Sequence, residues 1–153
     1  MALLIACHSQ GSPVIQEQST YSTSSGDDSF RQEEENMRLT INEQRISVDW
    51  ADNPTVQALY HRVKNQPIEI SVRDYASMEK VGELPETFSS SNEQMTTEAG
   101  DITLYNGRNL AFYYEPNNYS LTPIGKIQGM TKDEIRNMLT SQNELTVRLS
   151  VID

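Results

Sequence analysis

The chain offers few side chains that could carry out chemistry, and their spacing argues against a catalytic site. Its two histidines are His8, in a polar N-terminal stretch, and His61, on the predicted exposed side of a helix. Neither stands near a nucleophile or in a cluster of metal ligands, so we expect no triad and no metal site. Asp49 and Asp52 could form a carboxylate pair, but a turn residue and a residue preceding a helix explain them better. No glycine-rich phosphate loop is present, and we expect no cofactor.

Aromatic residues are concentrated in one part of the chain and could line a binding surface. They are Tyr105, Phe112, Tyr113, Tyr114 and Tyr119. Because successive strand residues point to opposite faces, Phe112 and Tyr114 share one face and Tyr113 lies on the other. We expect most of these rings in a core, while tyrosines at the rim of a barrel are suited to line a cleft.

Composition narrows the classes of partner. The chain has 153 residues and a net charge of −10. Nucleic acid is excluded as a partner, because a protein that binds phosphates needs a basic face. The same charge disfavours docking on anionic lipid. The single cysteine, Cys7, excludes an internal disulfide, and no apolar stretch approaches the roughly 20 residues that span a bilayer.

The N-terminus carries a second kind of signal. Leu4-Ile5-Ala6-Cys7 resembles a bacterial lipobox, in which the cysteine is lipidated and becomes the mature N-terminus. The sequence lacks the basic start and the 7–15 apolar residues of a full signal peptide. Either the signal is truncated here or Cys7 is an ordinary residue. We expect lipidation of Cys7 and a membrane-anchored, extracytoplasmic protein; the alternative is a cytoplasmic one.

Residues 1–36 differ from the rest of the chain. They carry six acidic residues and one basic residue, and Ser9 to Asp28 is dominated by Ser, Thr, Gln and Gly. Such a stretch buries too little apolar surface to offset the entropy of ordering it, which predicts a disordered polar tether. We therefore divide the chain into a truncated signal with tether, 1–36, and one folded domain, 37–153.

Periodicity predicts the elements of that domain. Alternating apolar residues indicate strands at 39–41, 46–48, 68–72, 102–104, 110–114 and 145–152. Residues 79–85 form an extended segment, and a further strand ends near residue 127. Asn106-Gly107 joins two of the strands in a tight hairpin. Arg73–Ser77 is expected to be a turn and 86–98 a surface loop.

Two helices complete the predicted order. Asn53 caps a helix over about 54–64 that begins at Pro54. Thr131 and Glu134 have the spacing of a capping box at the start of a second helix. The resulting order, β-β-α-β-β-β-β-β-α-β with short strands, predicts a mostly β fold: a closed antiparallel barrel with helices covering its ends.

Several dispersed motifs resemble one family. They are Trp50-Ala51-Asp52-Asn53-Pro54-Thr55, Asp74-Tyr75, Glu79-Lys80-Val81-Gly82-Glu83-Leu84-Pro85, Gly100-Asp101-Ile102-Thr103-Leu104-Tyr105 and Ser120-Leu121-Thr122-Pro123-Ile124-Gly125-Lys126-Ile127. In order and spacing they resemble the small bacterial cyclophilin-like domains over nearly all of residues 38–151. The resemblance implies a closed eight-stranded β-barrel with two short helices, and it leaves the activity open, because fold does not fix function.

The same resemblance suggests where a ligand would bind. Positions that match the family's shared residues give the candidate ligand contacts: Asp52, Asn53, Thr55, Lys80, Tyr113 and Ser120. Structural roles compete with this interpretation. Asn53 with Pro54 can simply start a helix, Gly125 can allow strands to approach closely, and Glu79-Lys80 can be a surface pair of little energetic weight.

Two functions remain open at this stage. The first is a non-catalytic module that binds a peptide or small molecule in a cleft beside the barrel. The alternative is a divergent peptidyl-prolyl isomerase that acts on exported proteins. Cyclophilin isomerases place an arginine in a Phe-x-x-x-x-Pro-Gly-Phe context, and this has no counterpart around Arg62, Arg73 or Arg108. The first function is therefore the prediction.

Overall fold

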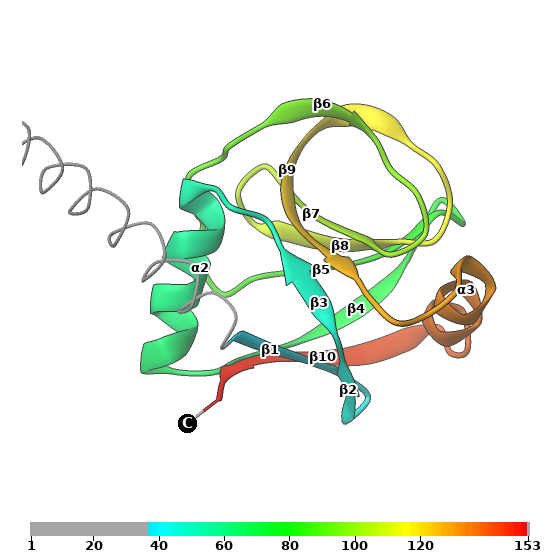
Figure 1. Ribbon diagram of the computed structural model, residues 1–153, viewed down its shortest axis with the longest axis horizontal. Coiled ribbons are helices and arrows are strands. Elements are labelled where there is room, and N and C mark those ends of the chain that lie inside the picture. The colour runs from blue at the N-terminus through cyan, green and yellow to red at the C-terminus, as the bar shows by residue number, and fades with distance from the viewer. Residues whose placement is uncertain (1–36, 153) are drawn as a thin grey trace, which may run out of the picture. The chain divides into compact units, whose positions relative to one another are not determined.

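The computed structural model describes residues 37–152, which form an antiparallel β-sheet with two helices (Figure 1). The predictions for Cys7 and for the tether fall outside these residues. The elements are β1 (Met37–Ile41), β2 (Gln44–Ile46), β3 (Val48–Trp50), α2 (Pro54–Asn65), β4 (Ile68–Tyr75), β5 (Glu79–Glu83), β6 (Glu93–Thr96), β7 (Asp101–Tyr105), β8 (Asn109–Tyr113), β9 (Asn118–Ile127), α3 (Lys132–Leu139) and β10 (Glu144–Val151).

The sheet is nearly closed into a barrel. Its strand order is β2-β1-β10-β4-β5-β8-β7-β9-β3, all neighbours are antiparallel, and β6 pairs with β9 outside this path. The edge strands of this order are β2 and β3, and the indole nitrogen of Trp50 in β3 donates to the Met37 carbonyl of β1 at 3.1 Å. The predicted fold class, a mostly β antiparallel barrel with two helices, is confirmed.

Both helices begin where their capping residues predict. The Asn53 side chain accepts from the Val56 amide at 2.9 Å, and its own amide group donates to the Pro123 carbonyl of β9 at 2.8 Å. Thr131 and Glu134 form the predicted capping box of α3. In Figure 1, α2 lies at the left of the barrel and α3 at the right, and both pack against the main core. Neither helix of residues 37–152 is long and apolar enough to cross a membrane.

The layer of β5, β8 and β7 is buried on both of its faces, as the alternation around Tyr113 predicts. Leu110, Phe112 and Tyr114 point into the main core with the apolar faces of the other strands and of both helices. Ala111 and Tyr113 point to the opposite face, where they form a second, smaller cluster with Leu121. This second cluster lies next to the site described below.

The β6–β9 pair builds a wall over that second face. β9 pairs with β3 and β7 through residues 122–127, and the register with β7 shifts between Ile102 and Thr103. Its first residues, Asn118 to Leu121, pair with β6 instead. In Figure 1, β6 and the start of β9 arch above β7 and β8. β9 therefore changes partner along its length, from β6 at its start to β7 and β3 at its end.

The described residues contain ten strands instead of the eight that the sequence predicts. One expected strand near Ile46 is split into β2 and β3 by Ser47. β6 forms within the predicted loop 86–98, because pairing with β9 and not apolar alternation makes this polar segment a strand. The predicted turn at 73–77 begins later, since β4 continues to Tyr75.

Candidate ligand-binding cleft

One cleft of about 490 Å³ opens on the second face of the β5–β8–β7 layer. Its volume lies within the range of roughly 300–1,000 Å³ that is typical of ligand pockets. Strands β4, β5, β7, β8 and β9 and the turns beside them contribute to it. The lining residues are Tyr75, Met78, Glu79, Val81, Tyr105, Asn109, Tyr113, Asn117, Tyr119 and Leu121.

Exposed tyrosines form the rim of the cleft. In residues 37–152 the large hydrophobic side chains that are exposed are Tyr75, Tyr105 and Tyr119, and all three line this cleft. Their exposed fractions are 62%, 40% and 48%. Tyr105 and Tyr119 meet edge to face with ring centroids 5.7 Å apart. Exposed aromatic rings gathered on a concave surface are typical of a binding surface, because they bury much area on contact at little rotamer entropy.

A row of three residues in register crosses the floor of the cleft. Glu79 of β5 lies directly opposite Tyr75 of β4 on one side and Tyr113 of β8 on the other. Side chains opposite one another in an antiparallel sheet have their Cβ atoms about 4.5–5.5 Å apart. The Glu79 carboxylate therefore stands between two tyrosine rings. Glu79 and Tyr113 are 9% and 3% exposed.

Burial shifts the ionisation of both groups. Burial raises the pKa of the Glu79 carboxyl above its ordinary value, and the negative charge of nearby Asp74 raises this pKa further. A hydrogen bond with Tyr113 lowers the same pKa but does not cancel the effect of burial. Burial is also the main reason why the pKa of the Tyr113 hydroxyl is raised, and the hydrogen bond with Glu79 adds to it. The Asn117 side-chain amide donates to the Tyr113 oxygen at 3.2 Å. The floor thus holds an acidic group whose charge is poorly solvated.

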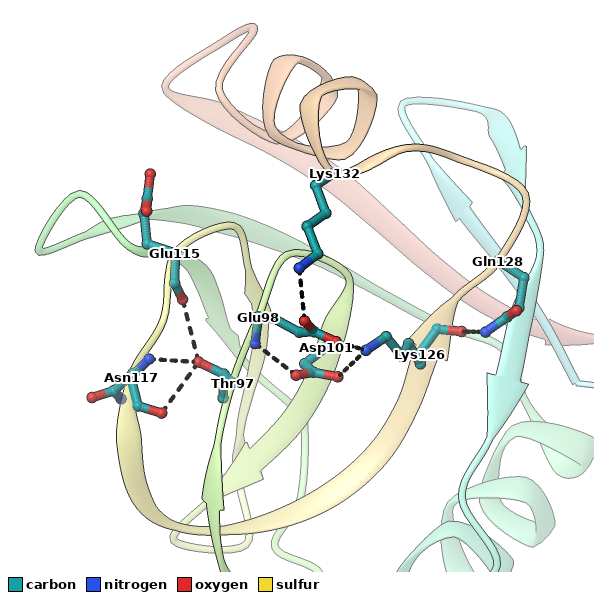
Figure 2. Close-up of polar contacts among 8 residues, drawn as sticks. All are labelled: Thr97, Glu98, Asp101, Glu115, Asn117, Lys126, Gln128 and Lys132. Carbon is teal, nitrogen blue, oxygen red and sulfur yellow. Dashed lines mark hydrogen bonds and ion pairs between the residues drawn. The ribbon is translucent and has the colours of Figure 1, made fainter.

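Thr97 positions the wall that carries Asn117 (Figure 2). Its hydroxyl donates to the carbonyls of Glu115 and Asn117 at 3.2 and 3.3 Å, and its oxygen accepts from the Asn117 amide at 2.8 Å. Thr97 itself is buried. The turn after β8 is therefore fastened to the end of β6, and Asn117 is held beside Tyr113.

A charge cluster beside this wall joins three elements, as Figure 2 shows. Glu98 pairs with Lys126 of β9 and, at 2.9 Å, with Lys132 of α3. Asp101 of β7 accepts from the Glu98 amide at 2.8 Å and lies 3.7 Å from Lys126. Hydrogen bonds with the two lysines lower the pKa of Glu98 to about 2. The cluster connects β7, β9 and α3 but does not line the cleft.

A second hollow, of about 210 Å³, lies between α3 and the start of β7. Four of the five charged side chains that line it are paired with one another: Arg136 forms an ion pair with Glu115 and lies over the Tyr114 ring at 5.8 Å from the centroid. Glu98 and Lys132 pair with each other there. This hollow offers less room and fewer free groups than the cleft, which we take as the candidate site.

Of the ligand contacts that the sequence predicts, Tyr113 lines the cleft. Lys80 does not, because it lies opposite Phe112 and its side chain leaves β5 on the other face. Its ammonium group donates to the carbonyls of Gln142 and Asn143 at 2.9 and 3.2 Å. The interpretation of Glu79-Lys80 as a surface pair is wrong: both side chains are buried, and strand alternation directs them to opposite faces.

The remaining predicted contacts lie away from the cleft. Asp52 is exposed before α2, and Asn53 caps that helix. Thr55 is buried and donates to the Ser89 carbonyl at 2.6 Å, which fastens the segment before β6 to the helix. Ser120 is exposed in β9, opposite Gln94 of β6. The structure does not bring these four together with Tyr113, and their role as ligand contacts stays a prediction.

The cleft contains residues that the prediction of ligand contacts left out. Tyr75 and Glu79 belong to motifs of the resemblance, but neither is among the ligand contacts that the sequence predicts. Strand alternation beginning from Val81 would have placed Glu79 on the cleft face, because residues two apart share a face. Tyr105 and Tyr119 belong to the aromatic group that the sequence places mostly in a core, and the structure puts them at the rim of the cleft instead. No group of three or more His, Cys, Asp or Glu side chains within residues 37–152 could hold a metal ion.

A comparison with protein-family models agrees with this architecture. The model of the cyclophilin-like family matches residues 39–150. A similar solved structure is the solution structure of a hypothetical protein from Archaeoglobus fulgidus, with 14% sequence identity, a TM-score of 0.49, and coverage of 76% of this chain and 93% of that one. A search of curated proteins found no match.

Proposed function

The chain belongs to the cyclophilin-like family, and we propose that it is a non-catalytic module that binds a peptide or a small organic ligand in the tyrosine-lined cleft. The observation that carries the proposal is the gathering of the exposed tyrosines 75, 105 and 119 around one cleft of about 490 Å³. Three large rings exposed to water forgo the free energy that burial of their apolar surface would give, and an occupant of the cleft would cover that surface.

The lining suits binding better than catalysis. A general acid or base needs a partner group and a reacting atom within hydrogen-bond reach. In the cleft, Glu79 is the only charged residue, and its hydrogen-bond partner is a tyrosine whose pKa is raised. The ten lining residues include no arginine, the residue that the cyclophilin isomerases use. A proline-isomerisation assay on the full chain is therefore expected to show the uncatalysed rate.

We propose the membrane anchor separately, on the sequence signal alone. Leu4-Ile5-Ala6-Cys7 has the lipobox pattern, and the polar segment that follows could serve as a tether between membrane and domain. Mass spectrometry of the native protein tests the anchor. An acylated Cys7 at the mature N-terminus supports an extracytoplasmic lipoprotein, whereas an intact Met1 would reject it.

Binding in the cleft can be tested without knowing the natural ligand. The isotope-labelled full chain is titrated with a set of acetyl-Gly-Xaa-Gly-amide peptides in which Xaa is varied, and amide shifts are followed by NMR. We expect at least one peptide to move the amides of β5 and of the start of β9 in a saturable way. Shifts confined to other surfaces, or no saturable shift with any peptide, would reject a peptide as the ligand of this cleft.

Replacing Tyr119 supplies the matched variants for this experiment. Tyr119→Phe keeps the ring and Tyr119→Leu removes it, while the position remains about half exposed. A ring that contacts the ligand by its face is worth about 0.5–1.5 kcal/mol beyond its buried area. We therefore expect the phenylalanine variant to bind nearly as tightly as the parent, and the leucine variant to bind several times more weakly.

A further inference from the structure

We infer that the occupant of the cleft is a peptide segment that places a lysine or arginine side chain against Glu79, between the tyrosine rings. The inference rests on the proposed binding function and adds the chemical class of the ligand. It is carried by the charge of the floor, by the arrangement of the rings and by the openness of the cleft.

The floor supplies a negative charge that lacks a cationic partner. Glu79 is the only charged residue among the ten that line the cleft. In the described part of the chain it takes part in no ion pair. Its neighbour Lys80 is directed to the other face, where it donates to two backbone carbonyls. A nearly buried carboxylate without a counter-ion is costly, and a cationic ligand would offset that cost.

The rings around Glu79 are suited to the same kind of group. Tyr75 and Tyr113 flank the carboxylate in register, and the edge-to-face pair of Tyr105 and Tyr119 lies at the rim. Ammonium and guanidinium groups are attracted to the faces of aromatic rings, and the attraction grows as water is excluded. Anionic ligands are disfavoured, because Glu79 is the charged residue among the ten that line the cleft and none of the ten is basic.

The shape of the cleft favours a side chain of a larger molecule over a free amine. The rim tyrosines remain 40–62% exposed, so an occupant is covered from one side only. A long cationic side chain can enter such a cleft with its apolar stem against the rings. Asn109 and Asn117 also belong to the lining; their side-chain amides donate to the Tyr105 carbonyl and to the Tyr113 oxygen, and each keeps a side-chain oxygen that can accept from a peptide backbone.

Isothermal titration of the full chain with matched peptides tests this directly. The probes are acetyl-Gly-Xaa-Gly-amides in which Xaa is lysine, arginine, norleucine or glutamate, together with n-butylammonium alone. We expect the lysine or the arginine peptide to bind at least about tenfold more tightly than norleucine, which corresponds to about 1.4 kcal/mol. The glutamate peptide should bind most weakly, and n-butylammonium should bind more weakly than the lysine peptide.

Two charge variants locate the effect. Glu79→Gln should abolish the preference for cationic peptides, so that the lysine and norleucine peptides bind it with similar affinity. Glu83→Gln removes the same charge from the same strand outside the cleft, at an exposed position, and should retain the preference. If Glu79→Gln does not fold, salt supplies a second measurement on the parent: about 1 M salt, with a Debye length near 3 Å, should weaken the cationic peptides selectively.

The outcomes separate the two proposals. Equal affinity for lysine and norleucine peptides, with shifts still in the cleft, would overturn the cationic ligand and leave the binding function standing. Binding of n-butylammonium as tight as that of the lysine peptide would overturn the peptide as the source of the cation. A complete absence of binding in the cleft would overturn both proposals.

Discussion

Replacing Asn53 tests whether this residue acts through the fold, as the structure indicates, or through a ligand. Its side chain makes two hydrogen bonds: it caps α2 at the Val56 amide, and it donates to the Pro123 carbonyl of β9. Loss of an N-cap costs about 1 kcal/mol, and loss of a neutral hydrogen bond costs about 1 kcal/mol more. Asn53→Ala should therefore lower the free energy of unfolding by about 2 kcal/mol.

Asn53→Ser divides this loss into its two parts. Serine keeps a capping oxygen but has no side-chain amide to reach β9, so we expect a loss of about 1 kcal/mol, from the second bond alone. Denaturant unfolding followed by circular dichroism measures both variants, and each kcal/mol corresponds to about 4 °C in Tm for a domain of this size. Because Asn53 does not line the cleft, peptide affinity should stay at the parental value.

Three results would refute this reasoning. A serine variant as stable as the parent would show that the bond to Pro123 contributes nothing, and equal stability of the alanine and serine variants would show the same for the cap. Parental stability combined with weaker peptide binding would show that Asn53 acts on a ligand and not on the fold.

Three further predictions follow from single residues. Glu79→Gln should raise the Tm near neutral pH and not in acid. Burial raises the pKa of this carboxyl, so the folded state binds more protons than the unfolded state and the parent loses stability as pH rises through that pKa. Calorimetry across pH measures the effect, and a Tm difference between variant and parent that does not change with pH would contradict it. Glu98→Gln should cost up to about 1 kcal/mol near neutral pH. Because the folded pKa of Glu98 is lowered to about 2, this loss of unfolding free energy should vanish as pH falls to that value, and also in high salt. A difference in unfolding free energy between variant and parent that persists in acid or in high salt would contradict the prediction. Gly107→Ala should destabilise the domain by roughly 1–3 kcal/mol, because Gly107 has φ +68° and an added Cβ would lie 2.3 Å from the Phe88 carbonyl oxygen. Denaturant unfolding measures this loss, and a variant that unfolds at the same denaturant concentration as the parent would refute the prediction.

Local signals in the sequence predict the parts of the fold that local interactions determine. Asn106-Gly107 has the positive φ angles of a tight hairpin, 52° and 68°, and both helix caps are where their residue types predict. Alternation correctly divides Phe112 and Tyr113 between two faces. These features depend on residues that are close in sequence, so a single chain reveals them.

The candidate site depends on pairing between distant strands, which is why the sequence predicts it only in part. Tyr75, Glu79 and Tyr113 form a row through the register of β4, β5 and β8, and no local pattern specifies that register. The polar strand β6 exists through its partner β9. Lys80, a residue type that is seldom buried, is held inside by two carbonyls that lie more than 60 residues away in sequence.

The central claim is that the tyrosine-lined cleft takes a cationic side chain against Glu79. The most direct measurement is a crystal structure of the full chain with acetyl-Gly-Lys-Gly-amide. We predict that the lysine ammonium lies within hydrogen-bond distance of the Glu79 carboxylate and that its stem packs against the rings of Tyr75 and Tyr119. A peptide bound elsewhere, or one seated in the cleft with its ammonium group directed to solvent, would contradict the claim.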